Sequence, residues 1–352
     1  MQKNKNKFSL ANSRFIFPFL IILLVLMVLF SMRYGAVEIS LEEIFSSIQK
    51  WFSNTENKTL TERIFLEIRL PRAILCVFVG ASLAVGGVLL QALFRNPIVE
   101  PGLVGTSCGA AFGAALYFTL GATFNFKDAD FGEYTLPLAA CLGAMISTGL
   151  VFLLSHSKQT GKSAIVSLLL TGIAINALFL SGVGFLSYIA RDPQARSIIF
   201  WNLGTLSGAN WSSVTIVGIV TFVSILIALR YAKQLNALMI GEEEAQFLGV
   251  RLNSLKWKIL LINVVMVAVA TAFVGIISFV GLIVPHLLRI LKGSDNRFLI
   301  KNSAVLGALL LSLADLLSRL IVAPAELPIG IVTSLVGVPV FIILLQKKNY
   351  LF

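Results

Sequence analysis

The chain has 352 residues, a formal net charge of +11, 57% hydrophobic residues and only 13% charged residues. So little polar surface excludes a soluble globular protein of this length, and apolar runs of about 20 residues recur along almost the whole chain, as spanning helices require. The composition therefore predicts an all-α, polytopic membrane protein with one transmembrane domain over residues 1–352.

The first apolar run, Phe15–Met32, follows a basic tail formed by residues 1–14. A basic segment before an apolar core is also typical of a cleaved signal peptide, but this core is long and no clear small-residue cleavage site follows it. We therefore expect a first spanning helix. The next segment, 33–72, is polar, and within it we expect a short amphipathic helix around Leu41–Phe52.

Nine further spans are expected along the rest of the chain. Gly105, Gly109 and Gly113 in the third span repeat every four residues, which predicts a glycine stripe and close packing against a neighbouring helix. The expected spans cover about 73–94, 102–124, 134–154, 164–190, 212–229, 259–272, a shorter stretch ending at residue 289, 303–322 and 327–345. Ten spans in all place both termini on one side of the membrane.

The charge of the loops predicts which side that is. Loops on the side of the termini hold 18 of the 28 Lys and Arg residues, whereas the opposite loops hold nine. Short cytoplasmic loops are enriched in basic residues, so both termini are predicted to be cytoplasmic. Because the positive charge is spread over short loops next to the membrane, it does not indicate nucleic-acid binding.

Residues 235–258 form the longest polar interruption in the C-terminal half of the chain, and we expect them to face the cytoplasm. Acids in a first turn, apolar residues three and four apart and a closing glycine together predict a short helix here. This helix either docks a soluble partner or belongs to a solvated loop that joins two spans. Its residues of interest are Gly241, Glu242, Glu243, Glu244, Ala245, Phe247, Leu248 and Gly249.

The sequence offers no catalytic set, because it contains no phosphate-binding loop, no zinc-protease motif and no nucleophile elbow. We therefore expect no enzyme activity. Its three cysteines lack a paired spacing and it has only two histidines, so we expect no bound metal either. Asp315 lies inside a predicted span, four residues before Arg319 on the same helix face. We expect an internal ion pair between them, with a proton-relay role for Asp315 as the alternative.

Arg69, Arg72 and Arg319 are all expected at the external face, against the general charge bias. Arginine is suited to bidentate pairing with carboxylates. The three arginines therefore either form a docking surface for an acidic external protein or anchor the chain at the membrane interface.

Several motifs occur in a characteristic order along the chain. They are RLPR from Arg69, QALFRNPIVEPGLVG from Gln91, the run from Gly241 to Gly249, FVGLIVPHLLR from Phe279, Ala314-Asp315 with Arg319, and ELPIG from Glu326. In this order they resemble the FecCD-type permeases, the membrane subunits of bacterial ABC importers for iron–siderophores, haem and vitamin B12. The likeness runs from about residue 60 to the C-terminus.

The resemblance implies a ten-helix subunit with the architecture of a type II ABC importer permease, located in the bacterial cytoplasmic (inner) membrane. It implies a homodimer with the translocation path between the two copies. Two cytoplasmic ATPase subunits, which would hold ATP and Mg²⁺, and a periplasmic or lipid-anchored substrate-binding protein are the expected partners. No cofactor is expected on this chain itself.

The resemblance also implies roles for individual residues. The run Gly241–Gly249 matches the coupling helix that sits in a groove of the ATPase, and the three arginines match those that pair with glutamates of the binding protein. Asn96 and Ile98 match the loop that forms a cytoplasmic gate. The expected cargo is an iron chelate, a siderophore or haem, with cobalamin (vitamin B12) as the alternative. A stand-alone secondary carrier is the competing class, and it would need no ATPase.

Overall fold

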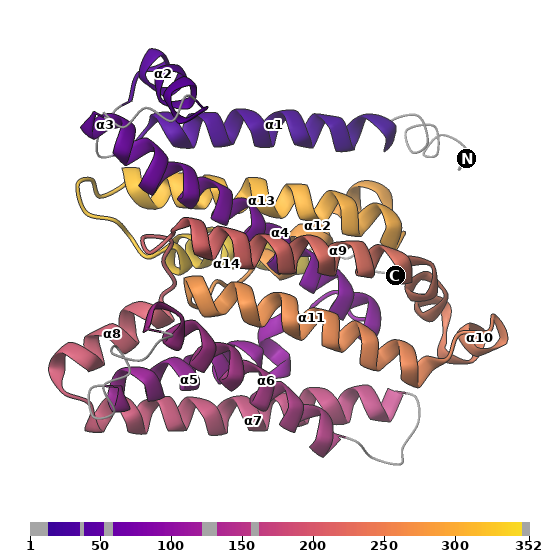
Figure 1. The fold of residues 1–352 in the computed structure, drawn as a ribbon. Helices are drawn as coiled ribbons and strands as arrows, with labels where there is room; N and C mark the ends of the chain where they lie inside the picture. Colours follow the sequence, from indigo (N-terminus) through magenta and orange to yellow (C-terminus); the bar gives the residue numbers. More distant parts are fainter. Residues whose placement is uncertain (1–12, 36–38, 53–58, 122–131, 156–161, 347–352) are drawn as a thin grey trace.

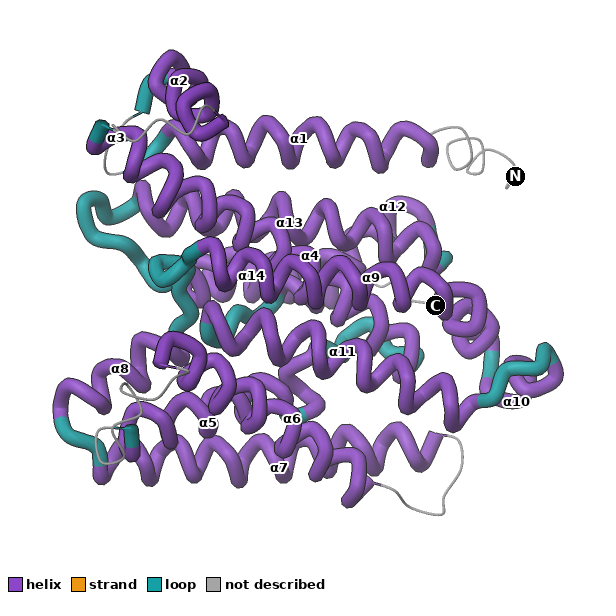
Figure 2. Tube along the Cα trace, in the orientation of Figure 1, coloured by secondary structure: helices purple, strands orange, loops and turns teal. Residues whose placement is uncertain are grey.

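The computed structural model describes residues 13–35, 39–52, 59–121, 132–155 and 162–346, and every regular element in these ranges is helical (Figure 2). The α-helices are α1 Ser13–Arg33, α2 Leu41–Phe52, α3 Leu60–Arg63, α4 Leu70–Phe94, α5 Thr106–Leu120, α6 Thr135–Ser155, α7 Lys162–Ile189, α8 Asp192–Asn202, α9 Trp211–Ile240, α10 Glu242–Phe247, α11 Leu252–Val274, α12 Val280–Lys292, α13 Asn296–Leu320 and α14 Ile329–Gln346. The long helices run side by side in one bundle (Figure 1).

The two ends of this bundle carry different short helices. α2, α3 and α8 gather at one end, which we call the α8 end, and α10 projects from the other, which we call the α10 end (Figure 1). α1 begins at the α10 end, and α4 runs the whole way from α3 to that end. The two ends of the bundle therefore differ in the short helices that they carry.

Within the described ranges, seven helical stretches are long and apolar enough to cross a membrane, namely α1, α6, α7, α9, α11, α13 and the continuous run 60–94. α5, α12 and α14, which correspond to the third, eighth and tenth expected spans, are shorter. α1 exposes most of its apolar side chains, whereas the window of the 60–94 run is 83% buried. Exposed apolar side chains on long helices indicate contact with lipid, so α1 lies at the edge of the bundle and α4 at its centre.

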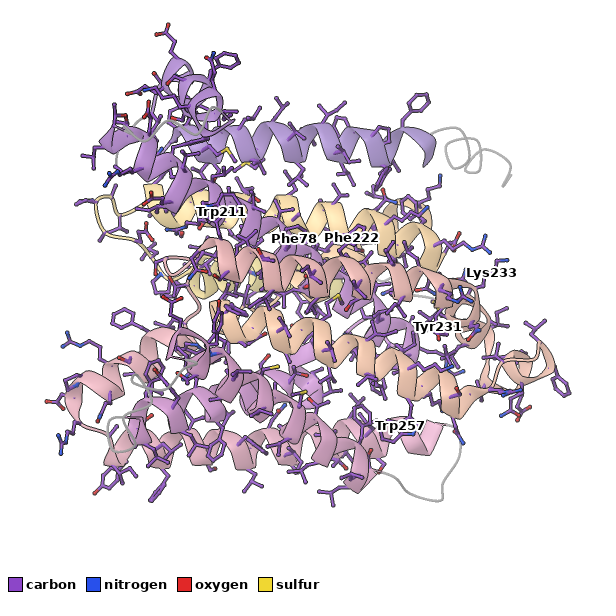
Figure 3. The ribbon with its side chains drawn as sticks, viewed as in Figure 1. Phe78, Trp211, Phe222, Tyr231, Lys233 and Trp257 are labelled. Carbon is purple, nitrogen blue, oxygen red and sulfur yellow. The ribbon has the colours of Figure 1, made fainter. Side chains whose placement is uncertain are left out.

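Two aromatic residues of α9 lie about one membrane thickness apart. Trp211 lies at the α8 end of α9, where its indole Nε1–H donates to the carbonyl of Leu66, and Tyr231 lies toward the α10 end (Figure 3). Twenty residues of helix separate these rings, which corresponds to about 30 Å, the thickness of a hydrocarbon core. Lys258 Nζ lies 5.6 Å from the centre of the Tyr231 ring. Both aromatics are therefore placed as interface residues.

Glycines set the closest contacts of α4. The backbone of Gly80 meets that of Gly307 in α13, and a Cβ at Gly87 would overlap the carbonyl of Gly281 in α12. Such contacts are possible only between residues without side chains. They hold α4 tightly between α12 and α13.

The predicted glycine stripe of the third span is confirmed. A Cβ on Gly109 would overlap the carbonyl of Gly143, and one on Gly113 would overlap the carbonyl of Ala139, so α5 and α6 are in backbone contact. The stripe lies in α5, but Gly105 comes just before this helix, with φ of +93°.

Some predicted boundaries are wrong for identifiable reasons. The second span does not start at residue 73 but is continuous with α3, because a π-helical segment, Ile64–Arg69, carries the helix up to Pro71. In this segment the N–H of Leu70 donates to the carbonyl of Phe65, and the wider turn accommodates a residue that cannot donate. α9 extends to Ile240 rather than ending near residue 229, and α8 was not predicted.

Candidate coupling, docking and transport sites

The helix predicted in the 235–258 stretch is present as α10, a six-residue helix that projects from the bundle between α9 and α11. Its acids Glu242, Glu243 and Glu244 occupy the first turn, where the helix dipole favours negative charge. Lys256 Nζ lies 3.0 Å from Glu242 Oε1, which fixes the start of α10 to α11.

Gly249 ends this helix as predicted. Its φ of +82° lies in the left-handed region, and the N–H of Val250 returns to the carbonyl of Ala245 at 2.9 Å. Ala245 is fully buried, whereas Phe247 is 88% exposed and Leu248 is 66% exposed. The polar start of α10 is therefore fixed to the bundle, and the tip exposes two large apolar side chains, Phe247 and Leu248.

At the opposite end, two of the three arginines, Arg72 and Arg319, meet at Asp315. Asp315 is almost fully buried, and its Oδ1 accepts from Arg72 Nε at 2.9 Å. Its Oδ2 lies 3.0 Å from Arg319 Nη2, so the internal ion pair expected for Asp315 and Arg319 is confirmed. Arg72 Nη1 also donates to both carboxylate oxygens of Glu326, at 2.9 and 3.0 Å.

Backbone carbonyls at the end of α1 complete this cluster. Arg69 Nη1 donates to the carbonyls of Met32 and Arg33, at 2.8 and 2.9 Å. Arg319 donates to the carbonyl of Tyr34 at 3.0 Å and to the hydroxyl of Ser31 at 2.6 Å. The arginines thus fasten α1, α4 and α13 together, and all three are 8% exposed.

This burial changes what the three arginines can do. A docking role would require an incoming carboxylate to share or replace partners that the side chains already have within the chain. The exposed member of the cluster is Glu326, whose side chain is 41% exposed. Docking of an acidic partner stays a prediction.

The predicted gate loop follows α4 at the α10 end. Arg95 adopts the left-handed conformation, with φ of +48°, and the N–H of Asn96 donates to the carbonyl of Gln91 at 3.1 Å. Asn96 Oδ1 then accepts from the N–H of Ile98 at 3.0 Å. This turn holds Ile98 half exposed at the bundle surface. Its role as a gate stays a prediction.

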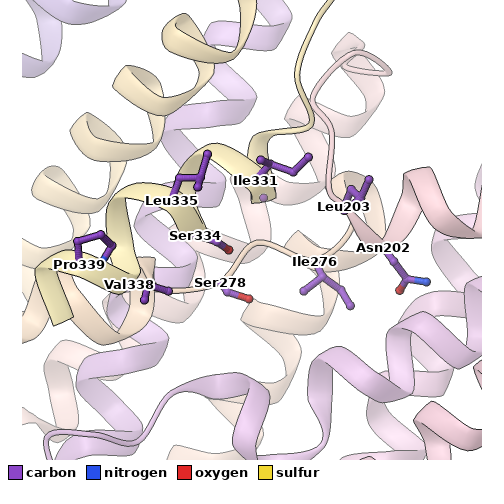
Figure 4. A pocket seen from close by; sticks show the side chains of 10 residues that line it. Asn202, Leu203, Ile276, Ser278, Ile331, Ser334, Leu335, Val338 and Pro339 are labelled. Carbon is purple, nitrogen blue, oxygen red and sulfur yellow. The ribbon is translucent and has the colours of Figure 1, made fainter. Parts of the chain in front are cut away.

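A cavity that was not predicted lies between α8, α14 and the segment that joins α11 to α12 (Figure 4). Its volume is about 560 Å³. The lining residues are Asn202, Leu203, Ile276, Ser278, Gly330, Ile331, Ser334, Leu335, Val338 and Pro339, and none of them is charged. The glycines and prolines that interrupt the apolar sequence 259–288 were a signal for an irregular segment, but not for a cavity beside it.

Comparison with known proteins gives consistent matches over almost the full chain. The sequence profile of the FecCD transport family matches residues 23–347. The hemin transport system permease protein HmuU of Yersinia pestis is 39% identical, with 96% of each chain covered. The vitamin B12 import system permease protein BtuC of Vibrio parahaemolyticus is 35% identical, with 94% of each chain covered. The molybdate import system permease protein MolB of Haemophilus influenzae is 32% identical, covering 93% of this chain and 94% of MolB.

A solved structure matches the fold as well. It is described as an inward-facing conformation of a putative metal-chelate type ABC transporter. It superimposes with a TM-score of 0.82 at 31% sequence identity, over 95% of this chain and 99% of the other.

Proposed function

The chain belongs to the FecCD transport family and is the permease subunit of an ABC importer, not itself an ATPase, and we propose that it moves an iron chelate, a siderophore or haem, from the periplasm to the cytoplasm. The related permease named for hemin transport supports this choice of cargo. Cobalamin is the second candidate, because another relative is named for vitamin B12 import.

The lining of the uncharged cavity beside α14 indicates which class of cargo fits. Seven of its lining residues offer apolar or backbone surface, and only Asn202, Ser278 and Ser334 have polar side chains. Ligand sites for large organic molecules are mostly apolar with a few polar groups, which suits a porphyrin, a corrin or a siderophore. A small oxyanion such as molybdate would be better served by Arg, Lys or clustered N–H groups. The lining therefore favours a chelate over an oxyanion.

The proposed assembly follows from the two ends of the bundle. α10 would sit in a groove of an ATPase subunit, and the Arg69, Arg72 and Arg319 cluster would meet an acidic binding protein. A second copy of the chain would cover the exposed face of α14 and close the cavity into a path. We place both termini in the cytoplasm, because the α10 end carries the excess of basic residues. Permeases of this kind typically bind no cofactor, and ATP and Mg²⁺ would be held by the ATPase subunits.

In this assembly the permease works by alternating access. ATP-driven closure of the two ATPase subunits would move α10 and, through Lys256 and the start of α11, the helices that line the path. The loop with Asn96 and Ile98 would close the path on the cytoplasmic side. Specificity would come mainly from the binding protein, so the path needs few polar contacts.

Co-purification of the tagged chain from native membranes, with identification of bound proteins and ligand, tests this proposal. We expect an ATPase and a binding protein that carries an iron chelate or cobalamin. Recovery of the chain alone, also after crosslinking, would favour the secondary carrier. Deletion of residues 242–248 separates the same two classes, because a carrier would retain uptake without them.

The cargo is tested by a charge placed in the cavity. Ser334→Lys introduces an ammonium group into the uncharged lining and should strongly reduce chelate uptake while the ATPase still co-purifies. The matched control is Ser207→Lys, at an exposed position outside the cavity, which should transport normally. Equal uptake by both variants would show that the cavity is not part of the translocation path.

A further inference from the structure

A second, smaller cavity lies in the interior of the bundle. Its volume is about 270 Å³, and it lies where the segment between α4 and α5 meets the middle of α7. Its lining includes Leu83, Glu100, Ser107, Asn176, Ser278 and Phe279. The two cavities share Ile276 and Ser278, so the irregular segment 275–279 separates them.

The position of these residues along their helices places the cavity near the middle of the membrane. Asn176 lies 14 residues after the start of α7 and 13 before its end. Leu83 lies 13 residues after the start of α4 and 11 before its end. At 1.5 Å per residue, both residues are about 16–21 Å from either end of their helices. The segment from Arg95 to Gly105 therefore leaves α4 at the α10 end and folds back to this depth.

Glu100 brings a carboxyl group to the cavity. The expected spans leave Glu100 in a loop outside the membrane, but in the structure Glu100 is partly buried and accepts a hydrogen bond from the backbone of Phe279. Among the residues that the structure describes, none of the ion pairs involves Glu100. An ionisable side chain at membrane depth normally has a partner and marks a functional pathway.

Further oxygen atoms converge on the same point, around Gly102. An ideal Cβ on Gly102 would lie 3.6 Å from Glu100 Oε1 and 3.5 Å from Ser107 Oγ. Asn176 Nδ2 donates to the Gly102 carbonyl at 3.1 Å, which fixes the orientation of the amide. Asn176 Oδ1 is buried without a hydrogen-bond partner in the described part of the chain. The cavity therefore gathers a carboxylate, an amide oxygen and a hydroxyl, which are all acceptors for a cation.

From this juxtaposition we propose that the cavity binds a monovalent alkali cation, held by Glu100, Asn176 and Ser107. In secondary transporters, irregular backbone beside broken helices at the bilayer midplane binds cations. One carboxylate with neutral oxygens matches a single positive charge, whereas calcium sites usually draw on several carboxylates. No group of three or more His, Cys, Asp or Glu side chains suited to a metal occurs in the described ranges. The ion would hold the segment 95–105 against α7.

The test uses the purified full-length chain in lipid nanodiscs, with sodium as the probe. Thermal unfolding is followed by tryptophan fluorescence while NaCl replaces choline chloride at constant ionic strength. We expect a saturable rise of the unfolding midpoint with Na⁺ that is lost in Glu100→Gln and weakened in Asn176→Ala. Glu133→Gln, which alters an exposed carboxylate, should keep the full response.

Two further measurements, direct sodium binding and a Gly102 variant, test the same site. Binding of radioactive sodium at equilibrium should be lost in the same variants. If Glu100→Gln does not fold, Gly102→Ala places a methyl group between the ligand atoms and should lower the sodium affinity in a folded protein. An unchanged response in Glu100→Gln, or none in the unaltered chain, overturns the proposal. So does a response to pH alone that depends on Glu100, because the occupant would then be a proton.

Discussion

Replacing Asp315 by asparagine tests how the bundle is held at the α8 end. The substitution keeps the size of the side chain and removes its charge. Asp315 is 1% exposed and pairs with Arg72 at 2.9 Å and with Arg319 at 3.0 Å. After the change, Arg319 would keep its bonds to Ser31 and Tyr34, and Arg72 would keep its bond to Glu326.

The expected loss of stability follows from these contacts. Removing one partner of a buried ion pair costs about 3–5 kcal/mol, because the remaining charge is left uncompensated. The asparagine amide oxygen can still accept from one arginine, so we expect the lower end of this range, about 3 kcal/mol. Glu326→Gln removes a contact whose carboxylate side chain is 41% exposed. Exposed ion pairs contribute about 1 kcal/mol or less, so this variant is the matched control.

Unfolding by sodium dodecyl sulfate in mixed micelles, followed by tryptophan fluorescence, measures both variants against the unaltered chain. Asp315→Asn should unfold at clearly lower detergent fraction, and Glu326→Gln should be close to the unaltered chain. The reasoning is refuted if Asp315→Asn costs no more than Glu326→Gln, since Asp315 would then not hold α13 to α4.

Three other predictions concern separate surfaces. Phe247→Ala should reduce co-purification of the ATPase without lowering the amount of permease in the membrane, because it removes the 88% exposed side chain at the tip of α10; an unchanged yield would contradict the coupling role. Leu335→Cys on the exposed face of α14 should crosslink two copies under mild oxidation, whereas Ile22→Cys on α1 should not, and the reverse pattern would move the dimer interface. Gly109→Ala should destabilise the fold, because a Cβ would overlap the backbone of α6, whereas Gly149→Ala has open space and should be neutral or stabilising by up to about 1 kcal/mol in the same unfolding assay.

Much of the fold could be predicted from apolar runs and glycine spacing, because both depend on local sequence. Helix ends were less predictable. Hydropathy marks where the chain leaves the hydrocarbon, but a helix can continue into water, as α9 does through Arg230 and Lys233 to Ile240. Likewise, the π-helical segment before Pro71 is a backbone adjustment that side-chain patterns do not reveal.

The candidate sites divide in the same way. α10 was predictable because its acids, its apolar tip and Gly249 are neighbours in the sequence. The pairing of Asp315 with Arg319 follows from a spacing of four residues. By contrast, Arg72 and Asp315 are 243 residues apart, so their contact depends on the packing of α4 against α13.

Glu100 shows a further limit of sequence reasoning. The break at Arg95, Asn96 and Pro97 correctly marks the end of α4, but it resembles an ordinary exit from the membrane. The returning segment contains only a four-residue turn, Pro101–Val104, before Gly105 and α5. A segment this short has no hydropathy signal of its own, and its depth is set by contacts with α7 and α11.

The charges of the arginine cluster decide which substitution can test docking. Arg72 pairs with Asp315 and Glu326, Arg319 pairs with Asp315, and Arg69 is held by backbone carbonyls. Three arginines and two carboxylates leave one surplus positive charge that an acidic partner would meet. Reversing an arginine to glutamate would add a carboxylate beside buried Asp315, and lost uptake could then follow from misfolding alone. Arg72→Gln instead balances the cluster and leaves the Asp315–Arg319 pair at 3.0 Å intact. We expect this variant to reach the membrane and bind the ATPase but to lose the binding protein and uptake, and normal capture of the binding protein would assign the arginines to folding only.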